Sequence, residues 1–329
     1  MYQTDQATAT NTLPTPASAG TQGFFTNGNP ASGVPATIVD ADWLNMIQQE
    51  LVNVVEAGGE TLSKTTYNQV LQAILALTGN PANNKVSGVV GQTRNLAMSV
   101  ATASSTATLT ADEIIVESAL GGLRYCLPSF SKTINLATTG AGGMDTGSAP
   151  ASGFVAIYAI YNPTTGTENL LATNATAAKV PEVYGGANLP SGYTASALVS
   201  VWQTNSSGQF IVGEQIDREI STFGTSVLST SAASPSYTAL NIAAAVPKNA
   251  VYYEGTVVLT SSSSQASLYF AMTSAGLGNK EAVSVSSNIS DSVGINVSGR
   301  IRTPQTIYYS LAISGGTLTA SLNISMYRF

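Results

Sequence analysis

Hydrophobic positions in the N-terminal quarter of the chain repeat with a helical period. The stretch 40–57, DADWLNMIQQELVNVVEA, predicts a helix that Asp40 or Asp42 can cap and that Gly58-Gly59 ends. A second helix is expected over 63–78. The two together predict a short helical hairpin.

Both expected helices carry apolar residues at the 3-4-3 spacing of a coiled-coil seam. The seam residues are Leu44, Ile47, Leu51 and Val54 in the first helix, and Tyr67, Val70, Ile74 and Leu77 in the second. Helices of this length are marginally stable alone, so the seam needs a partner. That partner is either a symmetry mate or the β-region of the same chain, and a dimer would use the same spacing as a trimer.

From residue 86 onward, the pattern changes to short runs rich in β-branched and aromatic residues. The expected strands are EIIVES, FVAIYAIY, ALVSVWQT and GQFIVGEQID. NPTTG predicts a turn that closes the 154–161 strand, and QTNSSGQ predicts a hairpin turn between the last two strands. This part of the chain is therefore expected to be an antiparallel β-domain.

The last third of the chain repeats this character in seven candidate strands at nearly regular spacing. They are YTALNIAA, AVYYEGTVVLT, ASLYFAMT, EAVSVSS, GINVSGRIR, TIYYSLAIS and TLTASLNISMYRF. Ser314-Gly315-Gly316 is expected to form a tight hairpin between the last two. So many strands in roughly 110 residues predict a self-contained sandwich or jelly roll over 221–329.

Residues 1–36 are rich in Thr, Ala, Gly, Pro and Asn and show neither period. We expect an extended segment that does not fold alone. Its one apolar pair, Phe24-Phe25, either anchors the chain on a partner or packs locally against the first helix.

The charge and hydropathy of the chain mainly exclude classes of function. Charged residues make up 9% of the chain, against about 25% in ordinary globular proteins. The net charge is −6 and no Lys or Arg cluster occurs, so nucleic-acid binding is not expected. No apolar run reaches the ~18 residues of a membrane-spanning helix, so membrane insertion is not expected either.

Catalytic chemistry has few candidates. The chain contains no His, which removes the commonest general base and transition-metal ligand, and we expect no cofactor or metal. Asp145-Thr146-Gly147-Ser148 matches the aspartic-protease signature. That chemistry needs two such carboxylates sharing a proton, and the motif occurs once. Asp145 is expected to cap a turn instead.

The stretch GFFTNGNPASGVPATIVDADWLNMIQQELVNVVEAGG, followed by YNQVLQAI, resembles the N-terminal region of tail fibres from tailed bacteriophages and phage-tail-like bacteriocins. MDTGSAPASGFVAIYAIYNPTTG, with PEVYGGANLPSGYTASALVSVW and GQFIVG, is similar to the β-domain behind it in such fibres. The resemblance covers about residues 20–220 and implies an elongated homotrimer, fixed to the tail or baseplate by its N-terminus and touching the host with its distal end.

The sequence thus predicts a mainly β protein with a short N-terminal α-helical hairpin and antiparallel β-sandwich domains, in four regions. These are a virion-attachment segment (1–39), a trimerisation collar (40–84), a β-rich shaft (85–220) and a receptor-binding tip (221–329). Such a protein is assembled in the host cytoplasm and ends up in the virion.

Exposed aromatics of the tip are the expected receptor contacts, because a ring can stack on a sugar or pack on a protein. Tyr252-Tyr253 and Tyr308-Tyr309 each place neighbouring rings on opposite faces of a strand, with one of each pair in the core or a trimer interface. The receptor is a bacterial surface polysaccharide or protein, and the sequence does not choose between them.

The leading hypothesis is a non-enzymatic receptor-binding tail fibre. One alternative is a structural fibre segment that carries a separate tip protein, with the C-terminal ISMYRF buried under that partner. Another is a fibre enzyme that degrades polysaccharide, which needs paired carboxylates. The tip offers only Glu254, Glu281 and Asp291 as acids, which disfavours this alternative.

Overall fold

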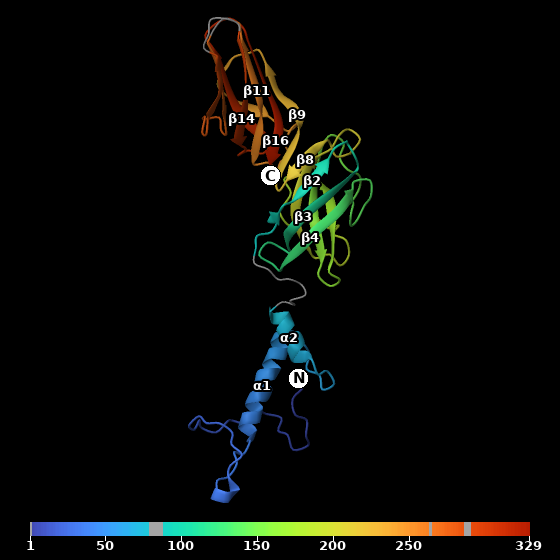
Figure 1. Ribbon diagram of the computed structural model, residues 1–329, viewed down its shortest axis with the longest axis vertical. Helices are drawn as coiled ribbons and strands as arrows, with labels where there is room; N and C mark the ends of the chain where they lie inside the picture. Colours follow the sequence, from blue (N-terminus) through green and yellow to red (C-terminus); the bar gives the residue numbers. More distant parts are fainter. Residues whose placement is uncertain (1, 79–87, 263–264, 286–290) are drawn as a thin grey trace. The chain divides into compact units, whose positions relative to one another are not determined.

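A computed structural model describes residues 2–78, 88–262, 265–285 and 291–329 (Figure 1). The chain forms two compact units, Met1–Lys85 and Val86–Phe329. The expected boundary at 84/85 lies outside the described residues. The protein is mainly β, with antiparallel sheets and two helices near the N-terminus, as predicted.

The first helix, α1 (Ala41–Ala57), agrees with its prediction to within one residue. Asp40 is its N-cap, and Oδ1 of that side chain accepts a hydrogen bond from the Trp43 backbone N–H at 2.9 Å. Val52 and Val55 are the buried residues of α1. The face of α1 defined by the predicted seam is therefore not the face that is most buried within the chain.

The second helix, α2 (Gln69–Thr78), is shorter than predicted because it does not begin at Ser63. The Gln69 side chain closes the preceding turn: its Oε1 accepts from the Ser63 N–H at 2.9 Å and its Nε2 donates to the Thr61 carbonyl at 2.6 Å. Such side-chain bonds compete with helical ones. Tyr67 consequently precedes the helix, and Gly79, its expected end, lies outside the described residues.

Helix α2 packs closely against Gly58, the C-cap of α1, where a Cβ would lie 2.5 Å from both Cα and Cβ of Ala73. We expect Gly58→Ala to force the helices apart and to lower helicity, measured by circular dichroism at 222 nm. Gly20→Ala is the matched control, since nothing lies within 4 Å of that position. Equal helicity in both variants would contradict this packing.

The second unit begins with eight strands that share one sheet. They are β1 (Thr93–Arg94), β2 (Ala97–Val100), β3 (Thr106–Glu117), β4 (Arg124–Asn135), β5 (Phe154–Asn162), β6 (Thr167–Asn174), β7 (Ala195–Gln203) and β8 (Gly213–Ile216). The order is β8-β2-β3-β7-β5-β6, with β1 and β4 also paired to β3. Strands β5 and β7 are buried on both faces, which explains their unbroken apolar runs.

The turns of this region are confirmed in part. Asn162 Oδ1 accepts from the backbone N–H of Thr164 and Thr165 and closes the β5–β6 hairpin, as predicted. The chain also reverses after β7, where Thr204 bridges Phe210. However, β7 and β8 are not hairpin partners, because β8 pairs with β2 and β9 instead.

The rest of the chain adds eight long strands. They are β9 (Glu219–Thr230), β10 (Ser234–Asn241), β11 (Tyr252–Ser261), β12 (Ala266–Ala271), β13 (Lys280–Val285), β14 (Asp291–Arg300), β15 (Thr306–Ile313) and β16 (Leu318–Arg328). All seven expected strands are present, and β9 is the eighth. Figure 1 shows β14, β11, β16 and β9 side by side.

Two four-stranded rows, β14-β11-β16-β9 and β10-β15-β12-β13, face each other. Almost every connection passes from one row to the other, and this order of eight antiparallel strands is that of a jelly roll. The prediction of a hairpin at Ser314-Gly315-Gly316 is wrong, because β15 and β16 belong to different sheets. Both β15 and β16 have a buried apolar face, and each packs in its own sheet. The turn between them therefore leads from one sheet to the other.

The expected domain boundary at 220/221 falls inside β9. The first residues of β9 pair with β8, and the whole strand pairs with β16, so one strand belongs to both β-regions. The jelly roll is therefore not self-contained as predicted. Alternation of polar and apolar residues along β9 identifies a strand but carries no information about which strands flank it.

Side chains reinforce this junction. The Tyr327 hydroxyl donates to the Val201 carbonyl at 2.8 Å, and Asn249 exchanges two hydrogen bonds with the Val180 backbone. The ring of Phe329 is 6% exposed, and the Arg218 guanidinium lies 5.1 Å from its centroid. The aromatic C-terminal residue is thus buried within its own chain.

Candidate functional site

The helical unit exposes a group of apolar side chains that includes the predicted seam. Leu44 is 54% exposed and Ile47 39% exposed, while Leu51 and Val54 are half-buried. In α2, Val70 is half-buried, and Ile74 and Leu77 are exposed. Tyr67 is almost fully exposed in the turn before the helix. The seam therefore has surface available for a partner.

Sequence spacing missed other members of this apolar surface. Trp43, Met46 and Leu71 are also exposed and lie on the same two helices. A strict 3-4-3 count passes over them, although a wider helical stripe includes neighbouring positions. We call the exposed apolar side chains of α1 and α2 the collar surface. Its members are Trp43, Leu44, Met46, Ile47, Leu71, Ile74 and Leu77.

The N-terminal segment is extended over most of its length, as expected, with a turn at Ala7-Thr8 and a short 3-10 helix at Pro30–Ser32. It is fastened to the hairpin by polar contacts: the Thr4 N–H donates to Gln48 Oε1 and the Ala17 N–H donates to Asp42 Oδ2, both at 2.8 Å. Lys64 pairs with Asp5 at 2.5 Å, and this contact lowers the pKa of Asp5.

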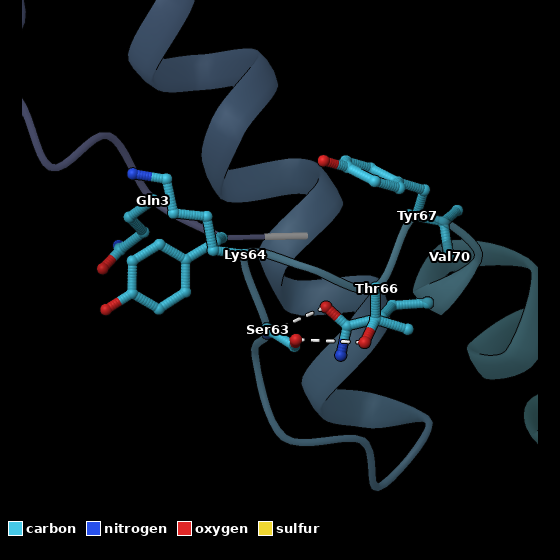
Figure 2. A pocket seen from close by; sticks show the side chains of 8 residues that line it. Gln3, Ser63, Lys64, Thr66, Tyr67 and Val70 are labelled. Carbon is cyan, nitrogen blue, oxygen red and sulfur yellow. Dashed lines mark hydrogen bonds between the residues drawn. The ribbon is translucent and has the colours of Figure 1, made fainter.

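A hollow of about 290 Å³ lies where the chain start meets the turn that precedes α2. Figure 2 shows the side chains that line it. Gln3, Lys64 and Tyr67 line it, and the hydroxyls of Ser63 and Thr66 are bonded to each other at 3.0 Å. The Lys64 ammonium is already paired with Asp5. This hollow therefore serves to seat the N-terminal segment.

The structure separates the two phenylalanines of the candidate virion-attachment site. Phe25 packs edge-on against Trp43 of α1, with ring centroids 5.0 Å apart, which matches the local-packing interpretation. Phe24 is 99% exposed. Of the pair, Phe24 is thus the residue whose ring is available to another protein.

The four tyrosines named as receptor contacts have different environments. Tyr253 is 2% exposed, so it is corrected to a core-side residue: it alternates with Tyr252, and the inward face of β11 also carries Val257. Burial raises the pKa of Tyr253. Tyr252 is half-buried on the outer face, with the Arg328 guanidinium 5.3 Å from its ring centroid.

Tyr308 and Tyr309 divide in a similar way. Tyr309 packs partly against the core, and Tyr308 lies on the outer face of β15 beside Ala239 and Ala271 of the neighbouring strands. Tyr269 shares that outer face and is half-buried. Our sequence analysis overlooked Tyr269, although its alternation with inward Leu268 and Phe270 could have identified it.

A cavity of about 250 Å³ lies where β11 and β14 of one sheet approach the end of β12 and the start of β13 of the other. Tyr252, Tyr253, Met272, Lys280 and Arg300 are among its lining residues. It is the place in the jelly roll where two of the candidate tyrosines meet basic side chains.

Asp145 is held in a hydrogen-bonded loop. Its Oδ2 accepts from the Tyr184 hydroxyl at 2.8 Å, and its Oδ1 accepts from the Thr146 backbone N–H at 2.8 Å. Both oxygens are thus engaged in fixing the loop, in keeping with the expected turn cap. Within the described ranges, no group of three or more acidic or Cys side chains could hold a metal ion.

The Tyr184–Asp145 bond predicts a loss of stability at alkaline pH. Burial and the neighbouring carboxylate raise the pKa of Tyr184 from 10 to about 12. Stability from this bond is complete below pH 10 and is lost as the pH rises through 12. Burial also raises the pKa of Tyr158 and Tyr327. The stability of the whole chain therefore falls more steeply with alkaline pH than the Tyr184 bond alone would cause.

We therefore expect the free energy of unfolding, measured with urea, to fall less between pH 10 and pH 12 for Tyr184→Phe than for the parent. At pH 8 the variant should be less stable by about 1 kcal/mol, the value of one hydrogen bond. Exposed Tyr67→Phe is the control. An unchanged alkaline slope in Tyr184→Phe would contradict the assignment.

Fold and site together define a mainly β protein with an N-terminal helical hairpin and a C-terminal jelly roll. Among the described residues, no helix is both long and apolar enough to cross a membrane. No family model matches the chain. It is 51% identical over 59 residues to the uncharacterized protein StfP of Escherichia coli K12, a match that covers 18% of this chain and 28% of that protein.

Solved structures give only weak similarity. The T13 particle of the virus IBDV aligns with 9% identity and a TM-score of 0.22, covering 74% of this chain and 67% of that one. The insecticidal delta-endotoxin Cry8Ea1 of Bacillus thuringiensis aligns with 10% identity and a TM-score of 0.18, covering 75% and 54%. At these scores neither similarity informs the function.

Proposed function

We propose that this chain is a non-enzymatic tail fibre of a tailed bacteriophage or phage-tail-like particle, and that it binds the host surface through its jelly roll. The observation that carries the proposal is the resemblance of residues 20–220 to tail fibres, quoted above. The StfP match adds no activity, because that protein is itself uncharacterized and only 28% of it is covered.

The N-terminal unit supports an attachment role in this proposal. An extended segment with Phe24 exposed at its surface suits docking on a tail or baseplate protein. The collar surface suits self-association into a homotrimer, because exposed apolar side chains on two helices gain stability when they are buried between copies. Three copies then present three receptor sites, and weak contacts sum to avidity.

The alternatives receive less support. In a fibre that carries another tip protein, the ISMYRF segment would be covered by that protein. Phe329 is instead buried within its own chain. A polysaccharide-degrading fibre needs paired carboxylates. Of the three candidate acids, Glu254 is half-buried, and the side chains of Glu281 and Asp291 lie outside what is described.

Adsorption blocking tests the proposal. Purified full-length chain is added to susceptible bacteria before the phage, and slower adsorption is the expected result. A chain stopped at residue 220 is a poor comparison because it cuts β9. Heat-unfolded full-length chain is the better control. If the folded chain does not slow adsorption at any concentration, the receptor-binding role is wrong.

The trimer has its own test, by mass in sedimentation velocity. We expect the parent chain to be a trimer and Ile47→Asp to be a monomer, because each copy would bury a carboxylate in the seam. Asn53→Asp adds the same charge to an exposed position of α1 outside the seam and should stay trimeric. A monomeric or dimeric parent chain would disprove the trimer.

A further inference from the structure

The cavity beside Tyr252 combines features of a small-ligand site. Its lining comes from four strands and the loop before β13: β11 supplies Tyr252 and Tyr253, β12 supplies Phe270, and β14 supplies Gly299 and Arg300. Its volume of about 250 Å³ suits a ligand the size of one sugar unit rather than a peptide. Because both sheets contribute, its shape depends on the folded jelly roll.

The inner wall is aromatic and holds an unused polar group. Tyr253 is 2% exposed and Phe270 3% exposed. Among the described residues, the Tyr253 hydroxyl bonds no other protein group, and it is not one of the fully buried polar atoms that lack a partner, so it opens onto the cavity. A Cβ at Gly299 would lie 3.2 Å from this hydroxyl, so glycine leaves it room beside β14. A ligand hydroxyl would supply the missing partner.

The rim is basic. Lys280 and Arg300 both line the cavity and are exposed. The Lys280 ammonium donates to the Ser298 carbonyl at 3.4 Å, which holds it across to β14. Within the described part of the chain, no ion pair involves either residue. Two uncompensated cations at one rim favour an anionic group.

Strand register adds an aromatic surface to this rim. Arg300, Tyr252 and Arg328 are direct neighbours on β14, β11 and β16, and Glu219 follows on β9. Arg328 is paired with Glu219, so its charge is compensated, and its guanidinium lies against the Tyr252 ring. The cross-strand row fixes Tyr252, and among the described residues Arg300 of the same row forms no ion pair.

We infer that this cavity binds an acidic sugar residue, bearing a carboxylate or phosphate, of the host surface glycan. The sugar ring packs on Met272, a sugar hydroxyl bonds the Tyr253 hydroxyl, and the anionic group pairs with Arg300 and Lys280 at the rim. This site rests on the proposed receptor-binding function and specifies its ligand class.

Titration of the full-length chain with free sugars, followed by ligand-observed NMR, tests the site. Glucuronic acid and glucose 6-phosphate are the probes, and glucose is the neutral control. We expect saturable binding of at least one acidic probe, at least about tenfold tighter than glucose, because charge-assisted hydrogen bonds are strong. Which probe binds identifies the anionic group. Equal affinity for glucose, or no saturable binding of either acid, would overturn the inference.

Variants localise the binding. Arg300→Gln should weaken binding of the acidic sugar about tenfold. Tyr253→Phe should weaken binding less and should keep the preference for the acidic sugar over glucose. Arg302→Gln removes the same charge from an exposed position outside the cavity lining and should bind like the parent. If Arg300→Gln and Arg302→Gln weaken binding equally, the cavity is not the site. Tyr253→Phe keeps the test valid should Arg300→Gln fold poorly.

Adsorption blocking separates this inference from the proposed function. Loss of blocking in Arg300→Gln, with blocking kept in Arg302→Gln, supports the cavity as the receptor site. Full blocking by Arg300→Gln would overturn the cavity's receptor role and leave the tail-fibre proposal standing. Failure of the parent chain to block would instead disprove the proposed receptor-binding role, and the sugar titration would still report on the cavity.

Discussion

Gly255→Ala is expected to destabilise the jelly roll by about 3 kcal/mol, at the upper end of the cost of overpacking. Gly255 lies in β11 next to an irregularity in its pairing with β16. A Cβ there would lie 2.1 Å from the Asn323 carbonyl oxygen and 2.9 Å from the Ile324 Cα. These are backbone atoms of a central strand, so the clash can be relieved only by separating the strands.

Urea denaturation with far-UV circular dichroism measures this loss as a lower midpoint. Gly294→Ala is the matched control, because Gly294 lies on the adjacent strand β14, paired with β11. Its Cβ would meet the Val257 carbonyl oxygen at 3.7 Å and nothing closer, which is an ordinary contact. We expect a change of less than about 0.5 kcal/mol there. Equal midpoints for the two variants would show that the β11–β16 register is incorrect.

Phe329→Ala is expected to cost about 3–5 kcal/mol, the usual loss for removing a buried phenylalanine ring. The ring belongs to the buried core, and the Arg218 guanidinium covers one side of it. The Phe329 N–H also donates to the Arg218 carbonyl at 3.2 Å. Removing the ring therefore leaves a cavity between β16 and the residues just before β9.

Thermal unfolding followed by intrinsic fluorescence measures this loss. Phe223→Ala makes the same change on β9, where the ring is 78% exposed, and should leave the midpoint nearly unchanged. A midpoint for Phe329→Ala that matches Phe223→Ala would mean that the aromatic C-terminal residue does not hold the two β-regions together.

Local patterns predicted the elements well because period and turn chemistry are properties of adjacent residues. Asp40 capped α1, and the alternation along β11 placed one tyrosine inside and one outside. The same alternation could also have shown which of the pair is buried. Tyr252 shares its face of β11 with the polar Glu254 and Thr256, whereas Tyr253 shares its face with the apolar Val257.

Long-range features escaped prediction because they depend on how strands far apart in the sequence pack together. The turn at Ser314-Gly315-Gly316 has hairpin composition, yet the apolar faces of β15 and β16 direct them to different sheets. The basic rim joins Lys280 and Arg300, which come from different strands and form no motif in the sequence. Only the three-dimensional packing of the two sheets brings these cations together with Tyr252.

The strand β9 sets a rule for building chimeras from this chain. A graft that replaces the C-terminal part after residue 220 would divide β9 between two parents and would separate Phe329 from Arg218. Exchange of the whole Val86–Phe329 unit keeps every pairing of β9 within one parent. Under the proposed receptor-binding function, a new host specificity is therefore more safely engineered by swapping that complete unit, or by changing outward-facing side chains on an intact one.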